Sequence, residues 1–112
     1  MLKLHDCGIY STSPMMESIA LSVVIPVYNE AENIRPLVEQ MESALRAAPG
    51  RIEILFVDDG STDQTLALLK EAQAKDARIR IAHFRRNLGQ TAAMAAGFRL
   101  ARGKAEIGRA HV

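Results

Sequence analysis

The 112-residue sequence predicts one small α/β domain with a parallel sheet and alternating helices. Three short apolar runs rich in β-branched residues occur at 21–27, 52–57 and 79–84. Such runs are typical of strands that are buried on both faces of a parallel sheet. Each run is followed by a polar turn and then by apolar residues at helical spacing. This alternation favours right-handed crossovers within one sheet.

The first unit joins the strand at 21–27 to a helix whose apolar residues run from Ile34 to Ala48. They repeat at i, i+3, i+4 and i+7 and therefore share one helix face. We expect Asn29 to cap the amino end of this helix. Pro36 lies close enough to that end to be tolerated, and the Pro-Gly pair at 49–50 ends the unit.

The second unit has a strand at 52–57 and a turn from Asp58 to Ser61. A helix is expected to follow, beginning at Thr62 or Asp63 and ending at Lys75. Ser61 or Asp63 can cap this helix, so capping alone does not explain the two adjacent carboxylates Asp58 and Asp59.

The third unit has a strand at 79–84, a loop at 85–89 and a helix at 91–102, closed by Gly103. This last helix is rich in alanine and glycine. Small side chains along a helix allow its backbone to approach the sheet closely, so we expect this helix to pack tightly.

The two ends of the chain differ from the middle. Residues 1–18 show no periodicity, and we expect them to form a disordered tail. Residues 106–112 (EIGRAHV) match the translation of a widely used short-read sequencing adapter. We therefore expect the natural sequence to end near Ala105 and the domain to span 19–105.

Composition excludes several classes of protein. The longest near-apolar run, at 19–27, is half of the ~20 residues that a bilayer crossing needs, so no membrane span is expected within the chain. Cys7 is the only cysteine, which excludes an internal disulfide and a cysteine-built zinc site. There is no signal-peptide pattern, no Ser/His/Asp set and no common glycine-rich phosphate loop. The missing glycine-rich loop argues against a dehydrogenase or a kinase.

Charge is divided unevenly along the chain, although the net charge is only +1. Residues 1–76 hold 6 Lys/Arg and 12 Asp/Glu, whereas residues 77–112 hold 8 and 1. A basic segment of this kind either lies near an anion site or forms a solvated basic face.

Polar segments at 26–30, 57–61 and 85–90 directly follow the three apolar runs. In an open parallel sheet, ligands bind beyond the carboxyl ends of the strands. Asp58 and Asp59 are therefore candidates to accept hydrogen bonds from a ribose hydroxyl or a base N–H, or to hold a metal ion. The alternative is a turn that merely uses Asp-Gly chemistry.

Other residues of these segments have two interpretations each. Tyr28 can stack on a base or pack over a strand end. Glu30 can stabilise its own helix or accept a bond from a ribose. Arg85 and Arg86 can neutralise a phosphate or belong to a solvated loop. His83 lies within a strand and is expected to be structural rather than a catalytic base.

Three stretches, at 22–33 (SVVIPVYNEAEN), 56–63 (FVDDGSTD) and 87–97 (NLGQTAAMAAG), resemble the opening of family 2 glycosyltransferases. The branch they resemble most includes dolichol-phosphate mannosyltransferase and bacterial polyprenyl-phosphate sugar transferases. The resemblance covers about residues 20–105. It implies a GT-A fold, in which a Rossmann-like sheet binds a nucleotide-diphosphate sugar, and it makes 19–105 the nucleotide-sugar-binding half of such a domain.

The resemblance also implies roles for particular residues. The first motif would line the nucleoside, with Glu30 near the ribose. The second would contact the base and ribose through Val57 and Asp59, while Asp58 supports that loop. The implied nucleotide-sugar-binding residues are Pro26, Tyr28, Glu30, Val57, Asp58 and Asp59, and no catalytic residue is assigned.

In such enzymes the next strand ends in an Asp-x-Asp motif that holds Mg²⁺ or Mn²⁺ on the diphosphate. That strand would begin near Ala105, so we expect it to be missing here, which would leave an open sheet edge. We accordingly expect this chain to hold no metal ion and to be inactive alone. The full-length protein would need a divalent cation and would transfer a hexose to a polyprenyl phosphate.

The resemblance further implies a cytoplasmic location, with the full-length protein at the cytoplasmic face of the membrane, and no nucleic-acid partner. Two other interpretations remain open. One is a non-catalytic nucleotide- or protein-binding α/β module. The other is a phosphoacceptor receiver domain, which also has acids at a strand end. A receiver domain would need a lysine at a later strand end, where this chain has Phe84 and Arg85.

Overall fold

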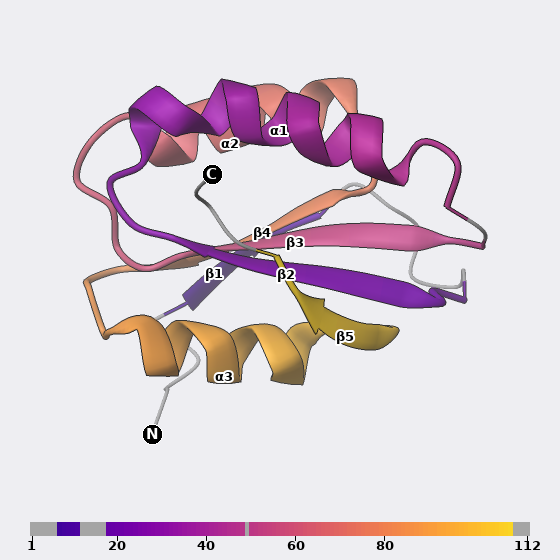
Figure 1. Cartoon of the computed structure of the whole chain (residues 1–112). Coiled ribbons are helices and arrows are strands. Elements are labelled where there is room, and N and C mark those ends of the chain that lie inside the picture. The colour runs from indigo at the N-terminus through magenta and orange to yellow at the C-terminus, as the bar shows by residue number, and fades with distance from the viewer. Residues whose placement is uncertain (1–6, 12–17, 49, 109–112) are drawn as a thin grey trace.

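The computed structural model describes residues 7–11, 18–48 and 50–108. These residues form a five-stranded mixed sheet, in the order β1-β4-β3-β2-β5, and three helices (Figure 1). The elements are β1 (Cys7–Tyr10), β2 (Leu21–Val27), α1 (Ala31–Leu45), β3 (Ile52–Asp58), α2 (Thr65–Lys75), β4 (Ile79–Phe84), α3 (Gln90–Leu100) and β5 (Lys104–Ile107).

The predicted α/β fold and its three strand–helix units are confirmed. Strands β2, β3 and β4 are parallel neighbours, with Val23 opposite Ile54 and Phe56 opposite Ile81. Helices α1 and α2 cover one face of the sheet and α3 covers the other (Figure 1). Both faces of the central strands are therefore buried, which explains their nearly continuous apolar sequences.

The helices begin at different residues than predicted. Asn29 does not cap α1, which begins at Ala31, because its side chain accepts a hydrogen bond from Thr62 N instead. Helix α2 begins at Thr65, after Asp63, since Ser61 and Thr62 bond to Asn29 in the loop between β2 and α1. Helix α3 begins one residue earlier than predicted, at Gln90, and ends two residues earlier.

The core has two layers of different character. Large side chains such as Ile25, Ile34 and Phe56 fill the layer under α1 and α2. The layer under α3 includes Ala93 and Ala96, as expected for a closely packed helix. The approach is closest at Gly97, where a Cβ atom would lie 2.3 Å from Val24 Cγ1.

The expectation of a tail at 1–18 is wrong for Cys7–Tyr10, which forms β1. This strand pairs antiparallel with β4. Two contacts with α2 explain why so short a segment is ordered: Gln73 Nε2 donates to Tyr10 O at 2.9 Å, and Lys70 Nζ lies 4.2 Å from the centre of the Tyr10 ring. Residues 1–6 and 12–17 lie outside the described residues.

The expectation of an open edge beside β2 is also wrong, because β5 pairs there in parallel. Leu21 lies opposite Lys104, and Val24 lies opposite Ile107. Half of this strand belongs to 106–112, whose origin in an adapter stays a prediction; of that stretch, 109–112 lie outside the described residues.

A buried carboxylate holds the turn into β5. Arg102 N donates to Glu53 Oε2 at 2.7 Å, and Arg80 Nη1 donates to Glu53 Oε1 at 2.8 Å. Ser22 Oγ also donates to this carboxylate and accepts a bond from Gly103 N. Burial alone would raise the pKa of Glu53, but the hydrogen bonds from Ser22, Arg102 and Arg80 outweigh burial and lower that pKa.

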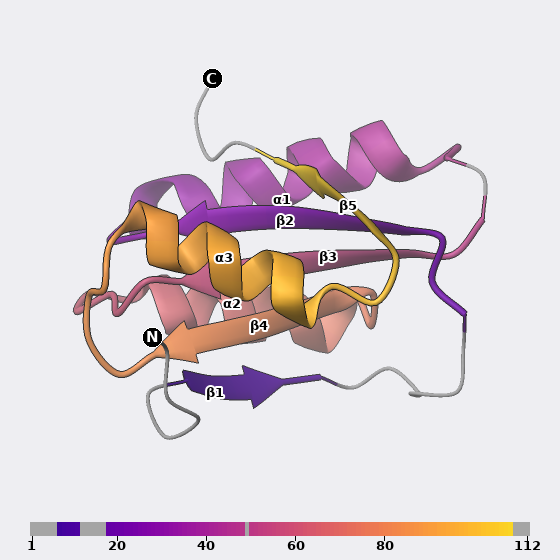
Figure 2. The ribbon, with the colours of Figure 1, turned by 90° about the horizontal axis from the view of Figure 1, so that it is seen from below.

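The order of the strands reverses direction once. The chain passes from β2 to β3 and β4, and α3 then returns across the opposite face to β5, on the other side of β2 (Figure 2). The reversal therefore lies between β2 and β5. In open α/β sheets the carboxyl edge at such a reversal is where ligands bind.

Candidate functional site

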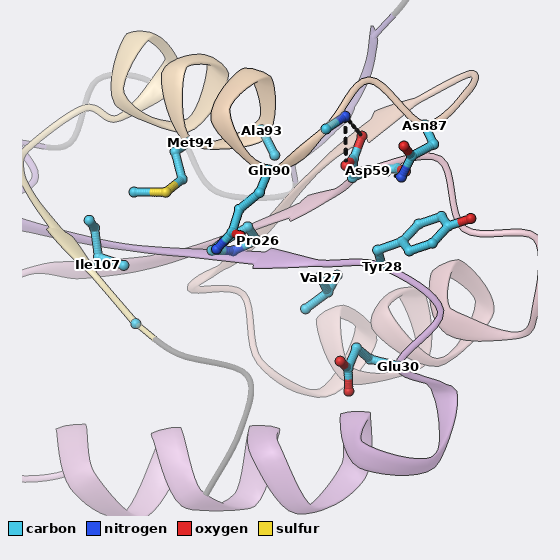
Figure 3. Close-up of a pocket in the computed structure, with 12 residues that line it drawn as sticks. Pro26, Val27, Tyr28, Glu30, Asp59, Asn87, Gln90, Ala93, Met94 and Ile107 are labelled. Carbon is cyan, nitrogen blue, oxygen red and sulfur yellow. Dashed lines mark hydrogen bonds between the residues drawn. The ribbon is translucent and has the colours of Figure 1, made fainter.

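A cleft of about 530 Å³ opens beside the carboxyl end of β2, next to the first turns of α3 (Figure 3). It lies where the strand order reverses, and its volume is in the range of small-ligand sites. Residues from the end of β2, from α3 and from β5 contribute to it, together with three loops: the first loop (28–30, after β2), the second loop (59–64, after β3) and the third loop (85–89, after β4). The lining residues are Pro26, Val27, Tyr28, Glu30, Asp59, Asn87, Gly89, Gln90, Ala93, Met94, Ile107 and Gly108.

The structure brings four of the six sequence-predicted residues together in this cleft, and these are Pro26, Tyr28, Glu30 and Asp59. Val57 and Asp58 do not line it, because both side chains are completely buried. Val57 packs in the core layer under α3, beside Gly97. Asp58 is the next residue in the strand, so its side chain points to the opposite face.

The first loop contributes an aromatic ring and a carboxylate. Tyr28 is 45% exposed although it is a large apolar ring, and it stands free at the mouth of the cleft (Figure 3). Glu30 is partly exposed and accepts a bond from Asn33 Nδ2 at 2.9 Å. Both residues therefore keep surface that a ligand can contact.

Pro26 suits its position in β2. The carbonyl of Val24 accepts a bond from Gly108 N at 2.8 Å, so this side of the strand faces β5. Pro26 lies two residues further on, on the same side and beyond the last residue paired with β5. Its missing N–H therefore removes no sheet hydrogen bond.

Asp59 connects the second and third loops. Its carboxylate accepts bonds from Leu88 N at 2.7 Å, Gly89 N at 3.1 Å and Asn87 Nδ2 at 3.2 Å. Its own N–H donates to Val27 O at 2.9 Å. Asp59 thus holds the loop before α3 against the end of β2 while it still faces the cleft.

Asp58 makes its contacts away from the cleft. Its Oδ1 accepts a bond from Ser61 N at 3.0 Å, and its Oδ2 lies 2.9 Å from His83 Nδ1. His83 is expected from the sequence to be structural, and it is engaged here with a completely buried carboxylate.

Sequence analysis placed the segment at 85–90 at this edge but gave Asn87 and Gln90 no role, and it missed the wall that α3 contributes through Ala93 and Met94. Ala93 and Met94 line the same cleft as Tyr28 only because α3 returns across the sheet to the reversal point. The small-residue pattern of α3 predicted close packing but not this direction. Arg85 and Arg86, the candidates for a phosphate contact, do not line the cleft.

The cleft is acidic in character. Two carboxylates, Glu30 and Asp59, face it, and no lysine or arginine is among its described lining residues. Carboxylates accept hydrogen bonds from hydroxyl and N–H groups, whereas they repel phosphate. This part of the cleft therefore suits a neutral group rich in donors beside an exposed aromatic ring.

The described residues contain no group of three or more His, Cys, Asp or Glu side chains that could hold a metal ion. The two cleft carboxylates therefore do not make a complete metal site by themselves. None of the helices in the described part of the chain combines the length and apolar character that a bilayer crossing requires.

Comparison with curated proteins finds relatives that act on polyprenyl phosphates. The chain is 42% identical over 97 residues to the dodecaprenyl-phosphate galacturonate synthase of Rhizobium johnstonii, covering 86% of this chain and 29% of that protein. It is 44% identical over 84 residues to an undecaprenyl-phosphate 4-deoxy-4-formamido-L-arabinose transferase of Pseudomonas paraeruginosa, covering 74% and 25%. The chain thus spans less than a third of the length of these relatives.

Solved structures share the fold at lower identity. TarS 1–349 of S. aureus superposes with a TM-score of 0.68 and 23% identity, covering 82% of this chain and 27% of that one. The mannosyltransferase PcManGT of Pyrobaculum calidifontis, solved with GDP-Man and Mn²⁺, superposes with a TM-score of 0.66 and 22% identity. The match covers 89% of this chain and 30% of that one. Both are GT-A transferases. Since the profile of Glycosyl transferase family 2 matches residues 22–107, most of the sequence, the chain belongs to that family.

Proposed function

We propose that this chain forms the nucleoside-binding part of the donor site of a glycosyltransferase that uses nucleotide-diphosphate sugars. The observation that carries the proposal is the cleft at the strand-order reversal, where Tyr28, Glu30 and Asp59 meet. Family membership and TarS, which has been solved with UDP-GlcNAc, support it.

The chemistry of the three side chains fits a nucleoside. The exposed ring of Tyr28 offers a face on which a base can stack. Glu30 and Asp59 offer acceptors for the ribose hydroxyls and for a base N–H. Pro26 shapes the floor at the end of β2. Val57 and Asp58 would act from behind the cleft, by packing and by holding the second loop.

The diphosphate needs positive charge that the described lining does not provide. We propose that a divalent cation serves the complete donor site, held by residues beyond those that line this cleft. PcManGT, solved with GDP-Man and Mn²⁺, supports this. Such a cation would offset the charge of the diphosphate leaving group.

We propose that the whole protein transfers a hexose from the nucleotide to a polyprenyl phosphate. The names of the relatives, which act on dodecaprenyl and undecaprenyl phosphates, support this acceptor class. A lipid acceptor and the resemblance to polyprenyl-phosphate transferases lead us to propose that the protein works at the cytoplasmic face of a membrane.

Calorimetric titration of the 112-residue chain with UDP and GDP tests the nucleoside site. Tyr28→Ala should weaken binding at least about fivefold, because stacking on an aromatic ring contributes roughly 1 kcal/mol or more. Phe98→Ala is a matched control, since Phe98 on α3 is also 45% exposed and does not line the cleft. Absence of binding to either nucleotide, or equal weakening in both variants, would contradict the proposal.

A further inference from the structure

The geometry points to Asn29 as a positioning residue of the donor cleft, which sets the orientation of Tyr28 and Glu30 without touching the nucleotide. The inference rests on the proposed function, because it concerns the same cleft. It depends on hydrogen bonds between the first two loops. We call this set the inter-loop cluster, and its members are Asn29, Ser61, Thr62, Asp63 and Thr65.

Asn29 bonds to the second loop through both its backbone and its side chain. Its N–H donates to Ser61 Oγ at 2.8 Å, and its Oδ1 accepts a bond from Thr62 N at 2.8 Å. The two bonds run in opposite directions between the same two loops. Together they fix both the position and the rotation of the Asn29 peptide.

The backbone of Asn29 is itself unusual. Its φ is +48°, and it is the only described residue other than glycine with a positive φ. Asparagine tolerates this left-handed conformation better than most residues do. The conformation turns the chain sharply between Tyr28 and Glu30, which both line the cleft, whereas Asn29 does not.

The other half of the cluster holds the start of α1. Glu30 N donates to Thr65 Oγ1 at 2.9 Å, and Ala31 N donates to Asp63 Oδ2 at 3.3 Å. No side chain of the first loop caps α1, so the second loop and the first residue of α2 satisfy these two donors instead. Hydrogen bonds from Thr65, led by its hydroxyl, lower the pKa of Asp63, which keeps this acceptor charged.

The first loop therefore has its conformation imposed by residues some thirty positions later. Tyr28 and Glu30 lie on either side of the fixed peptide, so loss of the inter-loop bonds would let both move. A ligand would then have to order the loop on binding, and its affinity would fall. This effect needs no contact between Asn29 and the ligand.

The test compares uncharged variants in the 112-residue chain. Asn29→Gly keeps the positive φ and removes the Oδ1 acceptor, while Ser61→Ala removes the partner of Asn29 N. Ser61→Thr keeps a hydroxyl and is the conservative control. The titrations use UDP or GDP, whichever binds wild type more tightly. We expect Asn29→Gly and Ser61→Ala to weaken its binding about fivefold. The affinity of Ser61→Thr should stay within twofold of wild type. Denaturant melts should confirm that each variant is folded at the titration temperature.

Hydrogen exchange of the amides at positions 29 and 30, which donate to Ser61 Oγ and Thr65 Oγ1, separates this inference from the proposed function when NMR follows it without ligand. Faster exchange at both amides in Asn29→Gly, with unchanged exchange in β3, supports the positioning role even when wild type binds no nucleotide. Wild-type affinity in both Asn29→Gly and Ser61→Ala, or unchanged exchange at positions 29 and 30, would overturn the inference.

Discussion

Gly60 and Arg86 approach so closely that a Cβ atom on Gly60 would lie 2.2 Å from the Arg86 carbonyl carbon. Gly60 also has a φ of +73°. The second and third loops therefore cross at a point that only glycine can occupy. This crossing brings Asp59 within reach of the amides of Leu88 and Gly89, on which one wall of the cleft depends.

Gly60→Ala should destabilise the chain by more than about 3 kcal/mol, because backbone strain and a backbone clash add together. Gly89→Ala is the matched control. Its φ is +102°, yet a Cβ atom there would meet nothing within 4 Å, so only strain of about 1–2 kcal/mol is expected. Urea unfolding of the two variants measures the difference. Equal destabilisation by Gly60→Ala and Gly89→Ala would show that the second and third loops have room for a Cβ atom at Gly60.

Glu53→Gln should cost about 3 kcal/mol, because it leaves Arg80 and Arg102 beside a neutral group in a buried network. Glu71→Gln is the control, since the ion pair of Glu71 with Arg35 is exposed and should contribute less than about 1 kcal/mol. Urea unfolding at neutral pH compares the two. A cost for Glu53→Gln no larger than that for Glu71→Gln would contradict the importance of the network.

The stability difference between wild type and Glu53→Gln should depend on pH. The folded chain lowers the pKa of Glu53 below its usual range. The stabilisation by the carboxylate is therefore fully present above the ordinary glutamate pKa of about 4.3, and it is lost as pH falls through the lower folded pKa. The stability difference between wild type and Glu53→Gln should shrink below about pH 4. A stability difference that grows in acid would show that folding does not lower the pKa of Glu53.

Asp58→Asn and Asp59→Asn should behave differently although the residues are adjacent. At position 58 an amide can still accept from Ser61 N and can donate to His83 Nδ1. At position 59 the carboxylate accepts from three donors, and an amide NH₂ would face an N–H. We expect Asp59→Asn to lose about 1–3 kcal/mol and to weaken nucleotide binding. Asp58→Asn should lose less.

The imidazole ¹⁵N shifts of His83 check the prediction for Asp58→Asn. If its amide donates to Nδ1, the neutral ring must carry its proton on Nε2. A ring that keeps a proton on Nδ1 in this variant would contradict that bond, and a larger stability loss than in Asp59→Asn would contradict the ranking.

Local patterns were sufficient to predict the central part of the fold. The strands at 21–27 and 79–84 have the predicted bounds, because continuous β-branched runs buried on two faces have few other conformations. Helix starts could not be predicted, since the bonds that decide them, such as Thr62 N to Asn29 Oδ1, join residues far apart in the sequence. The strand at Cys7–Tyr10 was missed for the same reason, because contacts with α2 stabilise it.

The cleft was predictable on one side only. The rule that ligands bind at strand ends placed the segments at 26–30 and 57–61 at this edge, and the family resemblance then assigned Pro26, Tyr28, Glu30 and Asp59 to the site. The rule does not say which of two adjacent carboxylates faces the ligand. Only the register of β3 shows that the side chain of Asp58 is buried and that Asp59 faces the cleft. The wall from α3 needed the direction of the last crossover, which no local pattern contains.

Gly97→Ala tests how closely α3 packs on the sheet. The new Cβ atom would lie 2.3 Å from Val24 Cγ1. Such overpacking costs about 1–3 kcal/mol, and it outweighs the gain of nearly 1 kcal/mol that alanine brings to a helix. Adding Val24→Ala removes the clashing methyl group, so the double variant should be more stable than the sum of the two single effects by about 1 kcal/mol.

Val23→Ala is the control for this cycle, because Val23 belongs to the core layer under α1 and α2 on the other face. Its effect should add to that of Gly97→Ala within about 0.5 kcal/mol. Urea unfolding of wild type, the three single variants and the two double variants gives both coupling energies. Additivity in the Val24 pair as well would show that α3 shifts to accept the methyl group. The wall of the cleft formed by Ala93 and Met94 would then be adjustable rather than fixed by the Gly97 contact.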